Sequence, residues 1–142
     1  VVGLVHDVLF ILGIYSIFYS IMPFSLEIDQ SFIAAILTVI GYSINDTVVV
    51  FDRIRENVGL YPKRALNELI NMSVNSTLSR TFSTSFSTAL PLLAMFIFGG
   101  ETIRGFVFAI LLGVIVGTYS TIFIASPIAY DIQQKQAKKA QK

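Results

Sequence analysis

The sequence of 142 residues contains no cysteine and a single histidine, His6. Without cysteine there is no disulfide framework, no thiolate metal site and no cysteine nucleophile, and one histidine excludes a multi-histidine metal centre. Charge is also scarce, because only 13% of the residues are charged, whereas 54% are hydrophobic and the mean hydropathy is +0.74. A soluble domain of this length needs more charge to cover its surface. The composition therefore predicts a membrane protein, and a net charge of +1 gives no sign of nucleic-acid binding.

Motifs of soluble enzymes are missing as well. The sequence has no glycine-rich phosphate loop, no zinc-ligand spacing and no nucleophile beside a base. We therefore expect neither an enzyme nor a bound metal or cofactor. The chain begins without methionine, inside an apolar run that no basic segment precedes. This start argues against a signal peptide and for a piece of a longer protein.

Four apolar stretches are long enough to cross a membrane, which takes about 20 helical residues. They are Val1–Met22, Ile28–Phe51, Leu78–Phe98 and Ile103–Ile128. The expected fold is an all-α membrane protein, with a transmembrane domain over residues 1–128 and a basic tail over residues 129–142.

Basic residues set the expected orientation. They gather in the connection 52–77 and in the tail 129–142, whereas acids mark the two short connections. Lysine and arginine concentrate in cytoplasmic segments, so the connection and the tail are expected in the cytoplasm. Within the connection, Pro62–Met72 is predicted to form a short amphipathic helix, because Pro62 suits a first helical position and apolar residues recur at helical spacing. This helix would lie on the membrane surface or serve as a plain helical linker.

Asp46 stands inside the second apolar stretch, six residues before Asp52. A charge at membrane depth costs at least about 2.5–3.5 kcal/mol on insertion scales, so it faces protein or water and usually has a partner. Arg80 lies a few residues inside the matching end of the third stretch, which runs the opposite way, so the two side chains reach similar depth. We predict an ion pair between Asp46 and Arg80. The pair either couples protons or only holds two helices together.

The third stretch is rich in hydroxyl groups around Arg80. Its hydroxyl residues are Ser76, Thr77, Ser79, Thr81, Ser83, Thr84, Ser85, Ser87 and Thr88. Serine and threonine join membrane helices by hydrogen bonds, and they can also line a path for ordered water. Because hydroxyls fall on all sides of this helix, we favour a partly hydrated path, with Thr84 on the same stripe as Arg80.

The fourth stretch carries small residues at every fourth position. They are Gly105, Ala109, Gly113, Gly117, Thr121 and Ala125. Such a stripe lets a neighbouring backbone approach closely, so these residues are expected to pack helices together.

Further polar residues are candidates for a relay or an interface. His6 and Asp7 stand together in the first stretch, and histidine changes charge near neutral pH, so they form either a proton relay or a hydrogen-bonded pair near the membrane surface. Asn45, beside Asp46, belongs to the same group. Asp52–Glu56 is expected to be a charge cluster where the second stretch leaves the membrane.

The stretch "GYSINDTVVVFDRIREN", residues 41–57, closely resembles the signature of the SecD/SecF family, membrane subunits of the bacterial protein-export accessory complex. The agreement continues upstream in "HDVLF" and "LEIDQSFIAAILTVI". Downstream it continues in "VNSTLSRTFSTS", "FGG" and "RGFVFAILLGVIVGTYSTIFIASPI". The Asp-Thr pair of the signature is similar to the SecF branch and differs from the SecD branch.

The resemblance implies a fold of the resistance–nodulation–division superfamily, with this chain as the last four spans of a six-helix bundle. It implies a subunit of the bacterial inner membrane that pairs with SecD, associates with the SecYEG channel and YajC, and assists preprotein export begun by SecA. The subunit would use the proton-motive force, with sodium as the alternative ion. By motif, Asp46 matches the intramembrane acid of the family, Arg80 its basic counterpart and Thr84 the hydroxyl-rich segment.

Two other functions stay open at this stage. The chain could be a passive scaffold for SecD or the SecYEG channel, or part of a different proton-coupled exporter of the same superfamily. Fusion to a SecD half also stays open.

Overall fold

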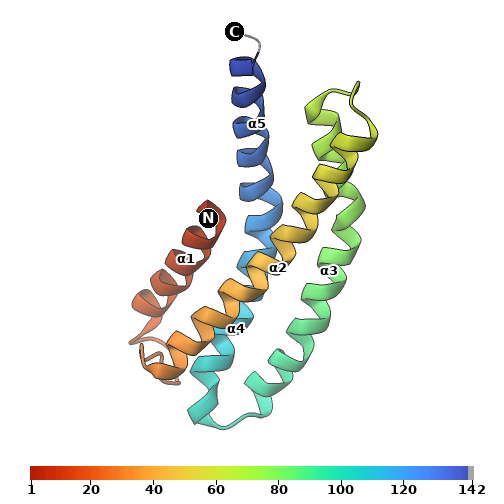
Figure 1. Ribbon diagram of the computed structural model, residues 1–142. Coiled ribbons are helices and arrows are strands. Elements are labelled where there is room, and N and C mark those ends of the chain that lie inside the picture. The colour runs from red at the N-terminus through yellow and green to blue at the C-terminus, as the bar shows by residue number, and fades with distance from the viewer. Residues whose placement is uncertain (141–142) are drawn as a thin grey trace.

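The computed structural model describes residues 1–140, with side chains described as far as residue 135. The elements in chain order are α1 (Val2–Phe18), α2 (Gln30–Leu60), α3 (Leu66–Phe98), α4 (Glu101–Ser120), the π-helical turn η1 (Thr121–Ala125) and α5 (Ser126–Ala140) (Figure 1). No strand occurs over residues 1–140, so the predicted all-α fold is confirmed.

Three helical stretches are long and apolar enough to cross a membrane, and they contain the last two predicted spans and all but the first two residues of the predicted span Ile28–Phe51. They are Gln30–Leu60, Leu66–Phe98 and Glu101–Lys135, the last of which joins α4, η1 and most of α5 into one rod. The apolar helix α1 is shorter. Of the basic tail, the side chain of Lys135 is described, whereas the side chains of Lys138 and Lys139, and the whole of Lys142, lie outside the described part.

The predicted surface helix Pro62–Met72 is wrong as a separate element. α2 continues to Leu60 and α3 begins at Leu66, so only a turn joins them, and Pro62 lies in that turn. Leu69 and Ile70, whose spacing suggested a helix on the membrane, are only 3% and 6% exposed. Ile70 packs with Val50 and Ile54 of α2 in a small apolar cluster. The apolar face of this segment therefore covers a neighbouring helix.

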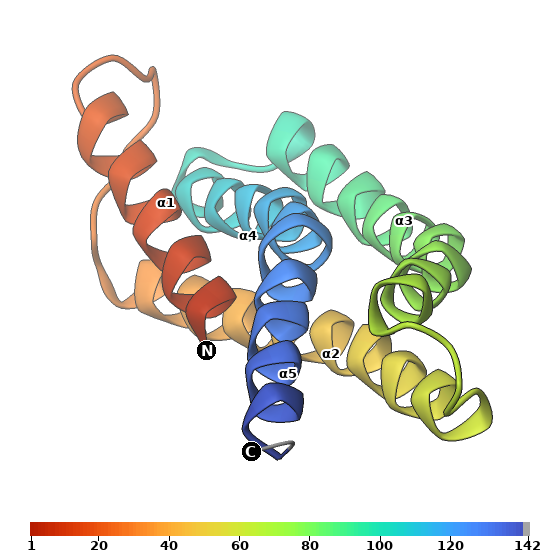
Figure 2. The same ribbon diagram turned by 90° about the horizontal axis from the view of Figure 1, so that it is seen from above.

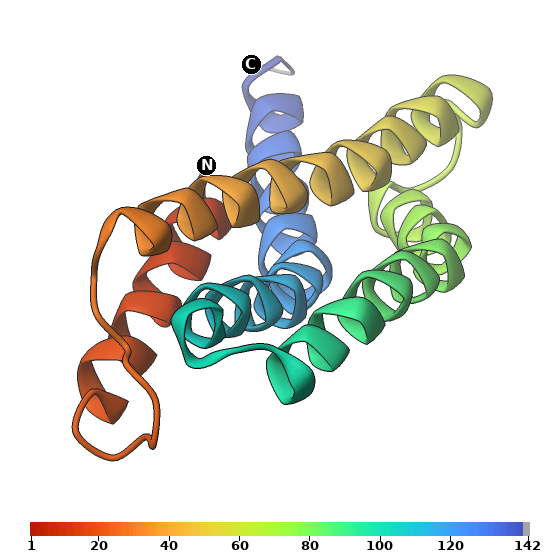
Figure 3. The same cartoon turned by 90° about the horizontal axis from the view of Figure 1, so that it is seen from below.

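The helix α4 lies at the centre of the bundle. It contacts α1, α2 and α3, and the views from above and below show it between those three helices (Figures 2 and 3). The main apolar core follows from this arrangement, with Ile11 and Tyr15 of α1 and Val39 of α2 among its most buried members.

Small residues let α4 approach its neighbours closely. A Cβ atom added at Gly113 would overlap the side chain of Val39, and one added at Gly117 would lie 3.5 Å from Ser43. At the other end of α4, a Cβ on Gly105 would lie 2.7 Å from the carbonyl oxygen of Ser25. Glycine therefore occurs in α4 at the positions where a neighbouring backbone or buried side chain fills the space that a Cβ atom would take.

The π-helical turn η1 interrupts the four-residue stripe of α4. The extra residue of a π turn shifts the faces of the helix that follows, so Ser126 takes the buried position and Ala125, the last member of the predicted stripe, is only partly buried. The hydroxyl of Ser126 donates to the carbonyl oxygen of Thr121 across 3.1 Å. Pro127 follows directly and has no N–H to donate, which explains why regular α-helical bonding fails at this place.

A buried polar layer as the candidate functional site

A layer of polar side chains crosses the apolar bundle at the level of residues 43–47 of α2. Its buried members are Asp7, Ser43, Asp46, Thr81, Thr118, Ser120 and Thr121. They come from α1, α2, α3, α4 and η1. Polar groups inside a membrane bundle need partners within the protein, and most of these residues bond to one another.

Asp46 is the incompletely bonded member of the layer. It is 8% exposed, and its Oδ1 accepts a hydrogen bond of 3.1 Å from the Thr81 hydroxyl. Its Oδ2 is buried and has no hydrogen-bond partner among the described residues. A buried acceptor without a partner costs about 1–3 kcal/mol. One oxygen of Asp46 is therefore held by Thr81, and the other has no partner among the described residues.

Arg80 does not form the predicted ion pair with Asp46. The prediction that Asp46 and Arg80 lie at similar depth agrees with the structure, because the residue that bonds Asp46 is Thr81, next to Arg80 in the chain. One residue turns the direction of a helical side chain by about 100°, and this turn leaves Arg80 exposed on the outer side of α3. There it lines an open cavity of about 290 Å³, whose α2 side includes Asp52 and Glu56. Over the described residues no ion pair joins Arg80 to an acid.

Thr84 of α3 and Asn45 of α2, like Arg80, do not face the buried layer. Both side chains are exposed, and the Thr84 hydroxyl donates to the carbonyl oxygen of Arg80 across 2.9 Å. The predicted stripe through Arg80 and Thr84 is therefore the outward one, whereas the buried stripe of α3 is Ser73, Thr77 and Thr81.

Asp7 is bonded far more completely than Asp46. It is 1% exposed, and its Oδ2 accepts from the hydroxyls of Ser43 and Ser120, each at 2.9 Å. Nδ1 of His6 lies 3.2 Å from its Oδ1, and His6 itself is partly exposed. His6 and Asp7 thus form a hydrogen-bonded pair, and Asp7 lies in the contact of α1 with α2 and α4.

Hydroxyl pairs connect the remaining helices of the layer. Thr47, the neighbour of Asp46, shares a hydrogen bond of 3.1 Å with Thr121 of η1. On the other side, Ser85 of α3 bonds to Tyr42 of α2 and to Thr118 of α4. The buried hydroxyls therefore join helices directly, and the hydrated path stays a prediction.

The charge cluster Asp52–Glu56 and the turn after α2 lie away from the layer. Arg53 Nη1 bonds to Glu56 Oε2 at 2.7 Å on the exposed side of α2. This pair is a half-exposed surface contact of the kind that adds little stability.

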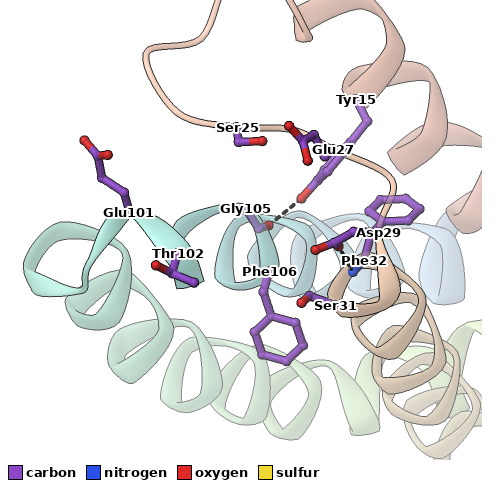
Figure 4. Close-up of a pocket in the computed structure, with 10 residues that line it drawn as sticks. All are labelled: Tyr15, Ser25, Glu27, Asp29, Ser31, Phe32, Glu101, Thr102, Gly105 and Phe106. Atoms are coloured by element: carbon purple, nitrogen blue, oxygen red, sulfur yellow. Dashed lines mark hydrogen bonds between the residues drawn. The ribbon is translucent and has the colours of Figure 1, made fainter.

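A second polar cavity of about 200 Å³ lies between the chain that joins α1 to α2 and the start of α4 (Figure 4). Glu27, Asp29 and Glu101 contribute to its walls. Asp29 caps α2 by accepting the N–H of Phe32 at 2.9 Å, and the Tyr15 hydroxyl donates to the carbonyl oxygen of Gly105. Over the described residues no group of His, Cys, Asp and Glu is arranged to hold a metal ion. These polar groups close the end of the bundle.

The fold and the layer together define the class of the protein: a multi-span helical membrane protein with an incompletely bonded carboxylate inside its bundle. Intramembrane acids of this kind mark ion and proton pathways in transporters. Residues 1–135 match the family model described as protein export membrane protein SecD/SecF, C-terminal. The chain belongs to the SecD/SecF family, as the signature in residues 41–57 predicted.

The similar proteins are SecF subunits. The chain is 52% identical over 139 residues to protein translocase subunit SecF of Rhodothermus marinus, covering 98% of this chain and 45% of that protein. With SecF of Cereibacter sphaeroides it shares 49% over 128 residues, which is 90% of this chain and 38% of the relative. The chain therefore spans less than half the length of these relatives.

A solved structure extends the similarity to three dimensions. The crystal structure of SecDF in the super-membrane-facing form matches with a TM-score of 0.84 and 46% sequence identity. The match covers 99% of this chain and 18% of that chain. The bundle described above is therefore the fold of the matched part of SecDF.

Proposed function

We propose that this chain is the C-terminal membrane part of a SecF subunit that uses the proton-motive force to promote preprotein export across the bacterial inner membrane. Asp46 is the group that binds the proton. The observation that carries the proposal is the buried Oδ2 of Asp46, which has no partner among the described residues. The chain is identical to two SecF subunits at about half of the aligned positions, and this similarity supports the export function.

In the proposed mechanism Asp46 alternates between two partners. The structure has Asp46 bonded to the neutral hydroxyl of Thr81, a partner that suits a protonated carboxyl group. A rotation of α3 by about one residue would bring Arg80 to the place of Thr81, and Thr84 would turn with it. Burial favours the neutral form of a carboxyl group, whereas a neighbouring cation favours the charged form. The exchange of Thr81 for Arg80 would therefore release the proton.

The membrane potential supplies the energy for this exchange. Moving one elementary charge across the membrane is worth about 2.3 kcal/mol per 100 mV, which is enough to bias a two-state element. A single proton per cycle at Asp46 would thus bias the equilibrium between the two positions of α3. The coupling ion in this scheme is the proton, and sodium is its alternative.

The exposed residues Arg80 and Asn45 are proposed to contact SecD. An arginine exposed to lipid at membrane depth is costly, and such residues face protein or water. A neighbouring helix of SecD that carries polar or acidic groups would cover Arg80. The SecYEG channel, YajC and, indirectly, SecA are the further partners of the proposed complex.

The proposed orientation places the turn between α2 and α3 and the basic tail in the cytoplasm. Lys63 and Arg64 lie in that turn, and Lys135 lies on α5, so basic residues mark one end of the bundle. Glu27, Asp29 and Glu101 lie at the other end, which would face the periplasm.

The test uses the full export complex in membrane vesicles. Asp46→Asn should abolish the increase in preprotein export that a proton gradient produces, while export without a gradient continues. Asp52→Asn is the matched control, because Asp52 is an exposed carboxylate on the same helix. Normal stimulation in the Asp46→Asn complex would reduce Asp46 to a structural residue and refute the proposal.

A passive scaffold is the second candidate function, and two observations favour it. No ion pair joins Asp46 and Arg80 over the described residues, and α4 packs against three helices, as expected of a bundle that only supports its partners. In that case all variants of Asp46 and Arg80 that assemble normally would export normally.

A further inference from the structure

Asp7 occupies a position that the rest of α1 fills with apolar residues. The buried residues of this helix are Asp7, Ile11 and Tyr15, four residues apart, so they share the face that meets α2 and α4. A carboxylate at such a place loses its contact with water, and this cost must be offset by bonds within the protein. Asp7 has those bonds.

One oxygen of Asp7 joins two helices that are far apart in the chain. Its Oδ2 accepts from Ser43 of α2 and from Ser120 of α4, both at 2.9 Å. The other oxygen lies 3.2 Å from Nδ1 of His6, which therefore orients the carboxylate from the side. Neither oxygen is left without a partner, in contrast to Asp46.

The helix packing around Asp7 leaves room for this junction. A Cβ on Gly117 would lie 3.5 Å from Ser43 and 3.9 Å from Oδ2 of Asp7, and one on Gly3 would lie 3.8 Å from the Ser120 hydroxyl. The backbones of α1 and α4 thus approach the two serines to contact distance, so a change at Asp7 acts directly on the spacing of α2 and α4.

Both serines lie beside the groups that surround Asp46. Ser43 precedes Asp46 by three residues, less than one turn of α2. Ser120 is followed by Thr121, whose hydroxyl bonds to Thr47, the neighbour of Asp46. The junction at Asp7 and the contact at Thr47 therefore hold neighbouring residues of α2 against the end of α4 and the start of η1.

We propose that Asp7 is a positioning residue for Asp46: by accepting Ser43 and Ser120 on one oxygen, it fixes the α2–α4 contact that places Asp46 opposite α3. The inference rests on the proposed function, because it concerns the group that exchanges the proton. Asp7 acts through the two serines and exchanges no proton itself.

The test compares Asp7→Leu with Asp7→Asn in the full complex. Leucine has nearly the same shape and removes both acceptors, whereas asparagine keeps one carbonyl oxygen for the two serines. Asp7→Leu should still assemble, because a serine hydroxyl that loses the carboxylate can turn to a backbone carbonyl of its own helix, as the Ser120 hydroxyl already does to Gly117. Its gradient-driven increase in export should fall about tenfold or more, the scale on which a small misplacement of a reacting group acts. Asp7→Asn should keep most of the increase.

A double variant, Ser43→Ala with Ser120→Ala, repeats the test without touching Asp7, should Asp7→Leu fail to assemble. It should also lose the increase, and Ser83→Ala, at an exposed serine of α3, is the control that should not. Equal loss in Asp7→Asn and Asp7→Leu would make Asp7 a proton carrier and overturn the inference. Unchanged stimulation in Asp7→Leu and in the serine double variant would overturn it too. The inference would also be overturned if the loss of gradient-driven export in each variant were fully explained by a smaller amount of assembled complex.

Asp46→Asn in the same vesicles separates this inference from the proposed function. If Asp46→Asn abolishes the increase and Asp7→Leu does not, only the positioning role fails. If Asp46→Asn keeps the increase, the proposed function fails, and the inference fails with it.

Discussion

The hydroxyl of Thr81 donates to Oδ1 of Asp46 across 3.1 Å, and this bond is the one direct link between α3 and the acid at the centre of the described bundle. Thr81 is 1% exposed and belongs to the stripe of α3 that faces the bundle. Because Oδ2 of Asp46 has no partner among the described residues, the Thr81 bond alone determines how the carboxyl group is held. The first prediction concerns this bond.

Replacing Thr81 by valine should destabilise the complex. Valine has the shape of threonine without the hydroxyl, so both oxygens of Asp46 would be buried without a partner, at a cost of about 1–3 kcal/mol. The melting temperature of the purified complex should fall, and Thr81→Ser, which keeps the hydroxyl, should largely restore it. An unchanged melting temperature for Thr81→Val would show that the bond to Asp46 contributes nothing.

The apolar runs predicted the three long apolar helices, because the length and hydropathy of a run can be read directly from the sequence. The level at which Asp46 meets α3 was also predictable, since antiparallel helices of known rise fix depth. The orientation of α3 about its own axis could not be predicted. Hydroxyls fall on every side of that helix, so its sequence does not indicate whether Arg80 or Thr81 faces Asp46.

The remaining differences have the same physical origin in tertiary packing. Leu69 and Ile70 are buried, and Ile70 packs against α2, whereas a periodic apolar face in the sequence cannot distinguish a protein neighbour from lipid. Asp7 stands near the start of the chain, which suggested a place near the membrane surface, yet it is buried because Ser43 and Ser120 reach it from helices that are distant in sequence. The π turn η1 is another such case, since its register shift follows from local bonding at Ser126 and Pro127.

Arg80→Gln should lower the gradient-driven export of the full complex by at least about tenfold. In the proposed exchange Arg80 takes the place of Thr81 beside Asp46, and removing one partner of such a buried charge pair costs about 2–5 kcal/mol. Arg80→Lys should give an intermediate loss, since lysine keeps the charge but lacks the planar fork of the guanidinium. Export with and without a gradient, normalised to the amount of complex, measures both effects. A complex that tolerates lysine and glutamine equally would favour the passive scaffold.

Gly113→Ala should destabilise the bundle by about 1–3 kcal/mol, the usual cost of adding a methyl group to a filled core. The added Cβ would overlap the side chain of Val39, so α4 and α2 would have to separate. Gly41→Ala is the matched control on α2, because no atom lies within 4 Å of a Cβ at that position, and alanine favours helix over glycine. Thermal unfolding of the two variant complexes should therefore change in opposite directions, and equal changes would contradict the close approach at Gly113.

Asn57→Ala should loosen the end of the α2–α3 hairpin, because Asn57 is buried and its Nδ2 donates to the Ser73 hydroxyl at 2.7 Å. The loss should be about 1–3 kcal/mol, the cost of a broken buried hydrogen bond. Hydrogen exchange of the amides from Leu66 to Ser73 in the complex should become faster, since these residues form the first turns of α3 and depend on α2 for cover. Asn75→Ala, at an exposed position of α3, is the control and should leave exchange unchanged. If residues 62–72 were instead a separate helix on the membrane, Asn57→Ala would not alter their exchange, so this measurement decides between a continuous hairpin and a surface helix.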